Sequence, residues 1–197
     1  MINAMKRNLD SARQATLSGI CIGLGGAAYL KLGSLEGAVL FAFGLLSVVH
    51  YKLPLYTGMA GFFNYKSRIE YVNLFAAILF NALGCFIAAA LVGFDGQDVI
   101  FQRIEAGYFL CLCRSILCGI IMTIIVGAAR KGNQILLIFG ITLFIACGFY
   151  HSIADAFYMF SSLEDIELVR DYLPYWLVII AGNFIGCNVP RLLKFEL

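Results

Sequence analysis

The fifth apolar run of the sequence, about residues 134–162, opens with QILLIFGITLFIACGFYHSIAD at positions 134–155. A helix needs about 20 apolar residues to cross the hydrocarbon of a bilayer. This run is long enough, but Gly148, His151 and Asp155 stand inside it. Backbone that leaves the helical conformation at membrane depth survives only where protein buries it or where it lines a cavity. The run therefore predicts a broken membrane helix beside a pore.

The composition of the whole chain agrees with a membrane protein. Of its 197 residues, 61% are hydrophobic and 13% are charged, and the mean hydropathy is +0.88. Soluble domains keep roughly a quarter of their residues charged, so this chain has too little polar surface to cover a globule in water. The net charge of +2 and the scattered basic residues argue against a nucleic-acid partner. The seven cysteines lie in apolar runs, where free cysteine packs as a small residue.

The apolar runs predict an all-α membrane protein, with six transmembrane helices in a single transmembrane domain that covers residues 1–197. The expected spans are about 15–33, 36–63, 71–93, 104–129, 134–162 and 173–190. The first run is too long for the apolar core of a cleaved signal peptide, so we expect it to stay as the first span. At the start of the last span, Tyr172, Tyr175 and Trp176 are expected in the interfacial aromatic belt.

The distribution of Lys and Arg predicts the orientation, because cytoplasmic segments of membrane proteins carry an excess of both. With the N-terminus inside, every inner segment holds at least two basic residues: Lys6, Arg7, Arg13, Lys66, Arg68, Arg130, Lys131, Arg191 and Lys194. The outer segments hold only Lys31, Arg103 and Arg170. We therefore expect a multi-pass protein of the cell (inner) membrane with both termini in the cytoplasm.

The second span is interrupted as well, by His50-Tyr51-Lys52-Leu53-Pro54. Proline removes a backbone donor and keeps the preceding residue out of the helical region. The third and sixth spans share a further pattern, since Asn81-Ala82-Leu83-Gly84 corresponds to Asn183-Phe184-Ile185-Gly186. Paired breaks in corresponding halves are typical of an inverted repeat with its site between the halves. We expect three spans in each half, about residues 15–93 and 104–190.

Four motifs, in order and spread over nearly the whole chain, carry a resemblance to a known family. They are Leu55-Tyr56-Thr57-Gly58, Arg114-Ser115-Ile116-Leu117-Cys118, Gly148-Phe149-Tyr150-His151-Ser152-Ile153-Ala154-Asp155 and Gly182-Asn183-Phe184-Ile185-Gly186. In all four the chain resembles the formate/nitrite transporter family. The resemblance implies a pentamer of independent pores with an aquaporin-like subunit. It also implies transport of formate, nitrite, hydrosulfide or short carboxylates, often with a proton.

By position, the resemblance implies that His151 and Thr57 face the pore centre. It implies a cytoplasmic constriction and an outer constriction, formed respectively by Leu45, Leu55 and Tyr56 and by Phe41 and Phe144. The chain also departs from the family pattern. Members usually carry lysine at position 103, asparagine at 119 and 155, and glutamate or another polar residue at 150. This chain has instead Arg103, Gly119, Asp155 and Tyr150, with Lys52 and Pro54 unusual in the broken loop.

A bare anion at the bilayer centre pays a large desolvation cost. Histidine suits a central donor of a proton or a hydrogen bond, because its unperturbed pKa of about 6.5 lies near physiological pH. Asp155 stands four residues after His151, so on continuous helix the two share a face and the carboxylate favours imidazolium. We therefore predict a channel or proton-coupled transporter for small monovalent anions such as formate or nitrite, with His151 acting between two apolar constrictions.

Several polar residues of the spans have two interpretations. Lys52 either attracts anions into the cytoplasmic half of the pore or pairs with a backbone carbonyl. Arg103 is either an anion-attracting residue of the outer vestibule or an exposed interfacial anchor. Thr57 donates its hydroxyl to the anion or caps the half-helix that follows, or does both. We expect structural roles for Arg114, which would tie the fourth span to a broken loop, and for Asn81 and Asn183.

The main alternative function is a channel for water or small neutral solutes. The Asn-Pro-Ala pair expected of an aquaporin is missing from the sequence. A membrane enzyme should show clustered titratable groups or metal ligands, but the two histidines stand far apart and no nucleophile–base motif is present. We therefore predict no enzymatic activity, no cofactor and no metal site. The expected partners are the small anion, the lipid bilayer and further copies of the chain.

Overall fold

The computed structural model describes the backbone of residues 2–195, and the side chains of residues 1–8 and 34 are not among those it describes. Lys6 and Arg7 of the expected inner segment therefore lie outside the described side chains. Within residues 2–195 every regular element is a helix, which confirms the all-α class. The helices are α1 (Ile2–Leu32), α2 (Ser34–His50), α3 (Tyr56–Ala60), α4 (Arg68–Val92), α5 (Gln97–Arg130), α6 (Gln134–Ala146), α7 (Ser152–Phe160) and α8 (Ile166–Leu192).

The helices have the length and composition of a multi-pass membrane protein. The part of α1 from Leu9 onward, α4, α5 and α8 are each long and apolar enough to cross a membrane, and α2 and α6 are shorter apolar helices. The expected second and fifth spans are each divided into two helices. Residues 51–55 separate α2 from α3, and residues 147–151 separate α6 from α7. Both predicted interruptions are therefore present.

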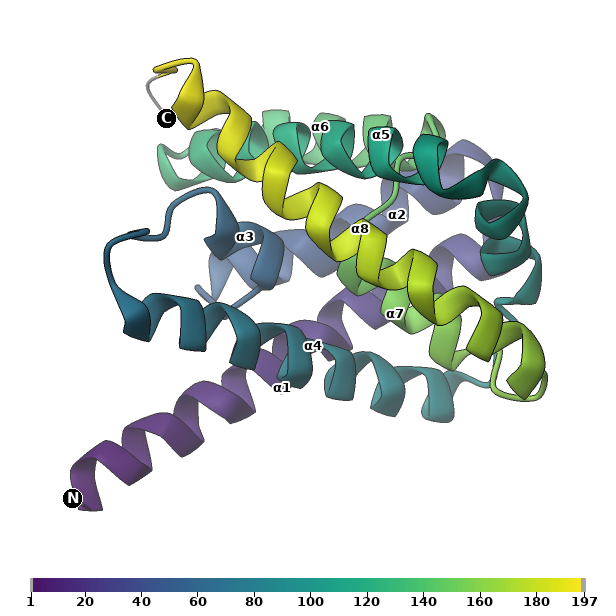
Figure 1. Cartoon of the computed structure of the whole chain (residues 1–197), viewed down its shortest axis with the longest axis horizontal. Helices are drawn as coiled ribbons and strands as arrows, with labels where there is room; N and C mark the ends of the chain where they lie inside the picture. The colour runs from purple at the N-terminus through teal and green to yellow at the C-terminus, as the bar shows by residue number, and fades with distance from the viewer. Residues whose placement is uncertain (1, 196–197) are drawn as a thin grey trace.

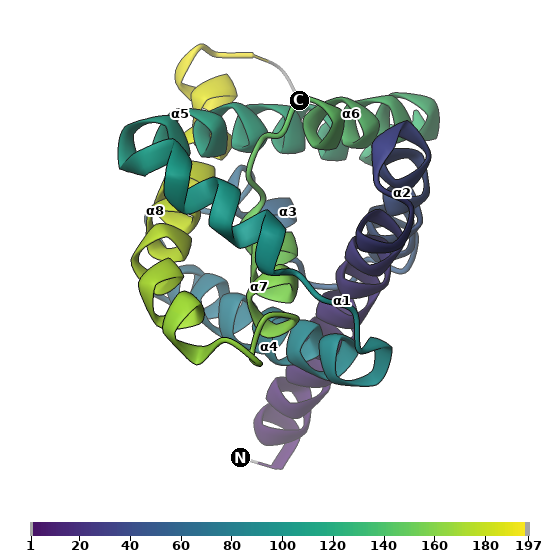
Figure 2. The same cartoon turned by 90° about the vertical axis from the view of Figure 1, so that its right-hand side faces the viewer.

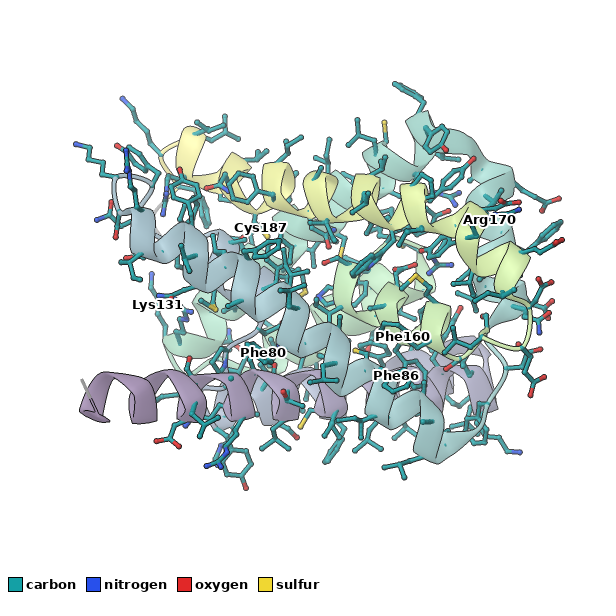
Figure 3. The ribbon with its side chains drawn as sticks, turned by 60° about the horizontal axis from the view of Figure 1, so that its bottom comes forward. Phe80, Phe86, Lys131, Phe160, Arg170 and Cys187 are labelled. Carbon is teal, nitrogen blue, oxygen red and sulfur yellow. The ribbon has the colours of Figure 1, made fainter. Side chains whose placement is uncertain are left out.

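The long helices surround the two short ones. Figure 2 shows α3 and α7 in the middle of a ring of the other six helices. Both chain ends lie at the end of the bundle that carries the α3–α4 connection, whereas the α4–α5 and α7–α8 connections lie at the opposite end (Figure 1). Lys131 and Arg170 also lie at opposite ends (Figure 3). This separation agrees with the sequence-based assignment of the two residues to opposite sides of the membrane.

Helices begin earlier than the hydropathy predicts, and in α8 and α5 the structure shows how. α8 begins at Ile166 rather than near residue 173, because the Asp165 carboxylate accepts the backbone N–H of Leu168 at 2.9 Å and caps the first turn. α5 begins at Gln97 rather than near residue 104 and bends at Gly107, where φ is 75° and ψ is 163°. Glycine adopts such angles without a Cβ clash. Because of this bend, residues 97–106 run in a different direction from the rest of α5.

The two interruptions start with the same backbone turn. In the first, Lys52 has a φ of 54° and the next residue's N–H donates to the Val48 carbonyl at 2.9 Å. In the second, Gly148 has a φ of 65° and the next residue's N–H donates to the Phe144 carbonyl at 2.8 Å. Helices commonly end in this way, usually with glycine in the left-handed position. Lys52 adopts this conformation with a Cβ, at a cost of about 1–2 kcal/mol.

Two buried asparagines, Asn81 on α4 and Asn183 on α8, hold the interruptions in equivalent ways. Each side-chain oxygen accepts the N–H of the first residue of a short helix, and each side-chain nitrogen donates to two carbonyls. One of these carbonyls belongs to the broken loop and the other to a neighbouring long helix. The partners are Tyr56, Pro54 and Ala15 for Asn81, and Ser152, Tyr150 and Ser115 for Asn183, all at 2.8–2.9 Å. These bonds satisfy backbone groups that leaving the helix exposes.

Glycines at the helix contacts allow the helix that carries each asparagine to approach its neighbouring helix closely. A Cβ added at Gly19 of α1 would collide with the Asn81 carbonyl of α4, and one added at Gly84 would collide with the backbone of α1. In the same way, a Cβ at Gly119 of α5 would collide with the Asn183 carbonyl of α8. Small residues allow two helix backbones to approach this closely. The α5–α8 contact therefore requires glycine at position 119.

We expect Gly119→Asn to destabilise the protein by about 3 kcal/mol, the upper part of the range for overpacking a filled core. The asparagine side chain meets backbone rather than the flexible end of a side chain, so α5 and α8 must separate to admit it. The measurement is the thermal unfolding of the detergent-solubilised protein. Gly58→Ala is the matched control, because the nearest atom to its new Cβ is 3.7 Å away. Equal unfolding temperatures for the two variants would contradict the prediction.

Candidate functional site

The two interruptions meet through one contact between side chains. The Thr57 hydroxyl, on the first turn of α3, lies 2.8 Å from Nε2 of His151, the residue that precedes α7. Thr57 is fully buried and His151 is 2% exposed. The hydroxyl is used in this contact, and the start of α3 is capped by Asn81, which accepts the Tyr56 N–H, rather than by Thr57. The structure thus brings together two residues that stand 94 positions apart in the chain.

The second nitrogen of the His151 ring defines the tautomer. Nδ1 accepts the backbone N–H of Ala154 at 3.1 Å, so that His151 caps the first turn of α7. A nitrogen that accepts a hydrogen bond carries no proton, and a neutral imidazole then carries its single proton on the other nitrogen. Nε2–H accordingly donates to the Thr57 oxygen. The Thr57 hydrogen is left to donate to a further acceptor.

Asp155 does not act on the imidazole, contrary to the expectation from its spacing. One oxygen of its carboxylate accepts the backbone N–H of His151 at 3.0 Å. The other accepts the Tyr172 hydroxyl at 2.7 Å and pairs with the Arg103 guanidinium. The expectation fails because His151 precedes α7, so the two residues do not lie on continuous helix. Asp155 instead fixes the backbone of the broken loop.

Arg103 is neither a free vestibule cation nor an exposed anchor. Its side chain is 12% exposed and forms an ion pair with Asp155, which is 1% exposed. A second bond runs from Nη1 to the Val99 carbonyl at 2.9 Å. Buried charges require such partners. Arg103 and Asp155 therefore neutralise each other inside the protein.

Tyr172 and Trp176 belong to the interior and not only to an interfacial belt. Tyr172 is fully buried and donates to Asp155. Trp176 Nε1–H donates to the Ser152 carbonyl at 2.7 Å, at the start of α7. Sequence reasoning missed both roles, although a signal exists. Positions 172, 176 and 179 lead to Asn183 at helical spacing and so share its inward face.

A cavity of about 90 Å³ lies beside His151, toward the end of the bundle predicted to face outside. Its walls include Arg103, Arg114, Tyr150, Phe144 and His151. The Phe144 ring lies 5.8 Å from the imidazole centre and 6.1 Å, edge to face, from the ring of Phe41. Both phenylalanines are buried. The predicted outer constriction residues are therefore in contact with each other, and Phe144 is adjacent to His151.

A larger cavity of about 1220 Å³ lies toward the opposite end and is lined by Leu45, Leu55, Lys52 and Arg130. The Lys52 side chain is exposed, and within the described residues its ammonium has no hydrogen bond or ion pair. Arg130 donates to the Gly58 carbonyl at 3.0 Å. No Asp or Glu is among the described residues that line this cavity. Its inner surface is therefore apolar at the two leucines and positively charged at the mouth.

The third residue of the predicted cytoplasmic constriction has a different place. Tyr56 is buried and lines neither cavity. Its hydroxyl donates to the Ile180 carbonyl on α8 at 2.9 Å. This bond ties the start of α3 to α8, next to the bond that Asn81 makes to the Tyr56 N–H. Tyr56 therefore holds α3 in position, while Leu45 and Leu55 line the larger cavity.

Comparison with known proteins identifies the family to which the chain is similar. The family model described as formate/nitrite transporter matches residues 3–190. A solved structure of an FNT family ion channel has 19% sequence identity and a TM-score of 0.81, and the match covers 98% of this chain and 91% of that one. A pentameric formate channel with formate bound has 16% identity and a TM-score of 0.79, with 98% and 97% covered. No curated protein sequence matches. From the family match over nearly its whole length, the chain belongs to the formate/nitrite transporter family.

Proposed function

We propose that this protein is a channel or proton-coupled transporter for small monovalent anions such as formate or nitrite. The observation that carries the proposal is the buried pair of Thr57 and His151, where two interrupted helices meet between apolar side chains. A histidine at membrane depth is a functional residue by default. The similar pentameric formate channel with formate bound supports an anion as the substrate.

The central pair lowers the cost of moving an anion through the membrane. An anion that leaves water pays several kcal/mol unless hydrogen-bond donors replace its hydration. The imidazole Nε2–H donates to the Thr57 oxygen, and the Thr57 hydroxyl hydrogen donates to the anion. The first bond polarises the hydroxyl and so strengthens the second. The N-terminal end of α7 begins at Ser152, directly after His151. Its helix dipole adds positive potential at the same place.

Apolar side chains on both sides of the pair act as the constrictions. Phe41 and Phe144 form the one beside the smaller cavity, and Leu45 and Leu55 form the one at the larger cavity. Narrow apolar rings exclude water and so block bare ions. An anion must therefore reach the donor pair partly dehydrated or as its neutral acid. Lys52 and Arg130 raise the anion concentration at the mouth of the larger cavity.

We propose six membrane crossings in one domain, arranged as two inverted, aquaporin-like repeats of about residues 15–93 and 104–190. The matching bonds of Asn81 and Asn183 and the matching turns at Lys52 and Gly148 support the repeat. The distribution of Lys and Arg supports an inner-membrane protein with both termini in the cytoplasm. The pentameric assembly of the similar formate channel supports a homopentamer.

The proposal is tested by flux into proteoliposomes that contain the purified protein. We expect formate and nitrite to enter faster than into empty liposomes, and urea to enter no faster, because the donor pair and the cationic mouth favour anions. Stopped-flow light scattering after a concentration jump measures all three solutes, at two pH values. Rapid urea entry with unaccelerated formate and nitrite would replace the proposal with a channel for neutral solutes.

A further inference from the structure

The smaller cavity holds two guanidinium groups, and their surroundings differ. Arg103 and Arg114 both line it, together with Tyr150, His151 and the carboxylate of Asp155. The Tyr150 ring lies near both guanidinium groups, with its centre 4.5 Å from that of Arg103 and 5.5 Å from that of Arg114. The cavity of about 90 Å³ holds roughly three water volumes of about 30 Å³ each. A ligand of this size has only a few heavy atoms.

The Arg103 charge is already used within the protein. Asp155 neutralises it, and the Val99 carbonyl accepts from it at 2.9 Å. An anion that bound Arg103 would have to compete with a buried carboxylate, and leaving that carboxylate unpaired is costly. Arg103 is therefore a poor binding partner for a transient ligand.

The Arg114 charge has no such partner. The side chain is half-buried, and its Nη1 donates to the Tyr150 hydroxyl at 2.8 Å. Within the described residues Arg114 forms no ion pair. A guanidinium carries five N–H donors in a planar fork, so a single bond to a neutral phenol leaves most of its binding capacity unused. The expected tie between the fourth span and the broken loop therefore exists, through the Tyr150 hydroxyl, but it does not account for the charge.

We propose that Arg114 is the outer anion-binding residue of the pore and that it favours planar anions with two oxygens, such as formate and nitrite. The inference rests on the proposed function, whose site it extends. A guanidinium fork matches two oxygens held in one plane, and the two parallel hydrogen bonds select geometry as well as charge. The anion bound there lies in the cavity that His151 also lines. An anion with a single acceptor atom, such as hydrosulfide, gains only the attraction to the charge.

The test measures initial flux against substrate concentration in proteoliposomes. Arg114→Gln is expected to raise the half-saturating formate concentration about tenfold, as loss of a charge-assisted hydrogen bond does. Arg114→Lys keeps the positive charge but lacks the planar fork of donors. It should therefore raise the half-saturating formate concentration severalfold and leave hydrosulfide flux unchanged. Arg170→Gln, on an exposed residue at the same end, is the control and should match wild type.

Tyr150→Phe separates binding from structure, because it removes the hydrogen bond of Arg114 and keeps the guanidinium. If Arg114 binds the anion, this variant keeps the wild-type half-saturating concentration or lowers it. If Arg114 acts only by holding the loop, Tyr150→Phe and Arg114→Gln should show the same loss, and the inference is overturned. A wild-type half-saturating concentration in Arg114→Gln overturns it as well. Wild-type protein that moves no formate at all would instead refute the proposed function.

Discussion

Replacement of Arg103 by glutamine is expected to destabilise the protein by about 3–5 kcal/mol, the cost of removing one partner from a buried ion pair. Asp155 is 1% exposed, and after the change its carboxylate keeps only the Tyr172 hydroxyl and the His151 N–H. These two donors do not cancel its charge. Thermal unfolding in detergent, followed by the loss of monodisperse protein, measures the effect. The same variant should lose formate flux, because Asp155 fixes the backbone of His151.

Two further variants give this prediction its controls. Adding Asp155→Asn to Arg103→Gln removes the unpaired charge and should recover most of the stability, since a neutral pair avoids the desolvation penalty. Arg170→Gln breaks another Arg–Asp pair, whose side chains are 73% and 66% exposed, and should change stability by no more than about 0.5 kcal/mol. If the double variant is as unstable as Arg103→Gln alone, the pair does not act through its charge.

The interruptions of the second and fifth spans were predictable because glycine, proline and polar residues in an apolar run have few physical explanations. Residues 51–55 and 147–151 are non-helical, as the sequence indicates. The ends of helices were less predictable. A hydropathy profile does not detect the Asp165 cap or the bend at Gly107, since both depend on backbone geometry rather than on apolar content.

The candidate site was predictable only in part. His151 stands out by its place in an apolar run, whereas the prediction that Thr57 faces the pore centre came from the resemblance to the family. The partner of Asp155 was not predictable, because Arg103 stands 52 residues away and reaches it only through the bend of α5. The spacing rule that paired Asp155 with the imidazole assumed a continuous helix. A helix that begins between the two residues turns the carboxylate toward the backbone instead.

Replacement of His151 by alanine is expected to lower formate flux roughly 10- to 100-fold, which corresponds to about 1–3 kcal/mol, the cost of leaving buried hydrogen-bonding groups unpaired. Alanine leaves the Thr57 oxygen without its donor and the Ala154 N–H without its acceptor. His151→Gln should lose less, because the glutamine amide places an N–H donor near the position of Nε2. Initial rates of formate uptake in proteoliposomes measure both variants. His50→Ala changes the other histidine, which is exposed beside Tyr51, and should transport as wild type does.

The pH dependence of these variants separates a hydrogen-bond donor from a proton carrier. The Nδ1 of His151 accepts a backbone N–H, so adding a proton to the ring would break the cap of α7. A ring that stays neutral donates from Nε2 at every pH in the working range. His151→Gln should then show the wild-type pH profile at a lower rate, because the pH dependence comes from the fraction of the permeant present as its acid. If the imidazole instead carries the proton across, His151→Gln, which cannot titrate, must flatten the profile.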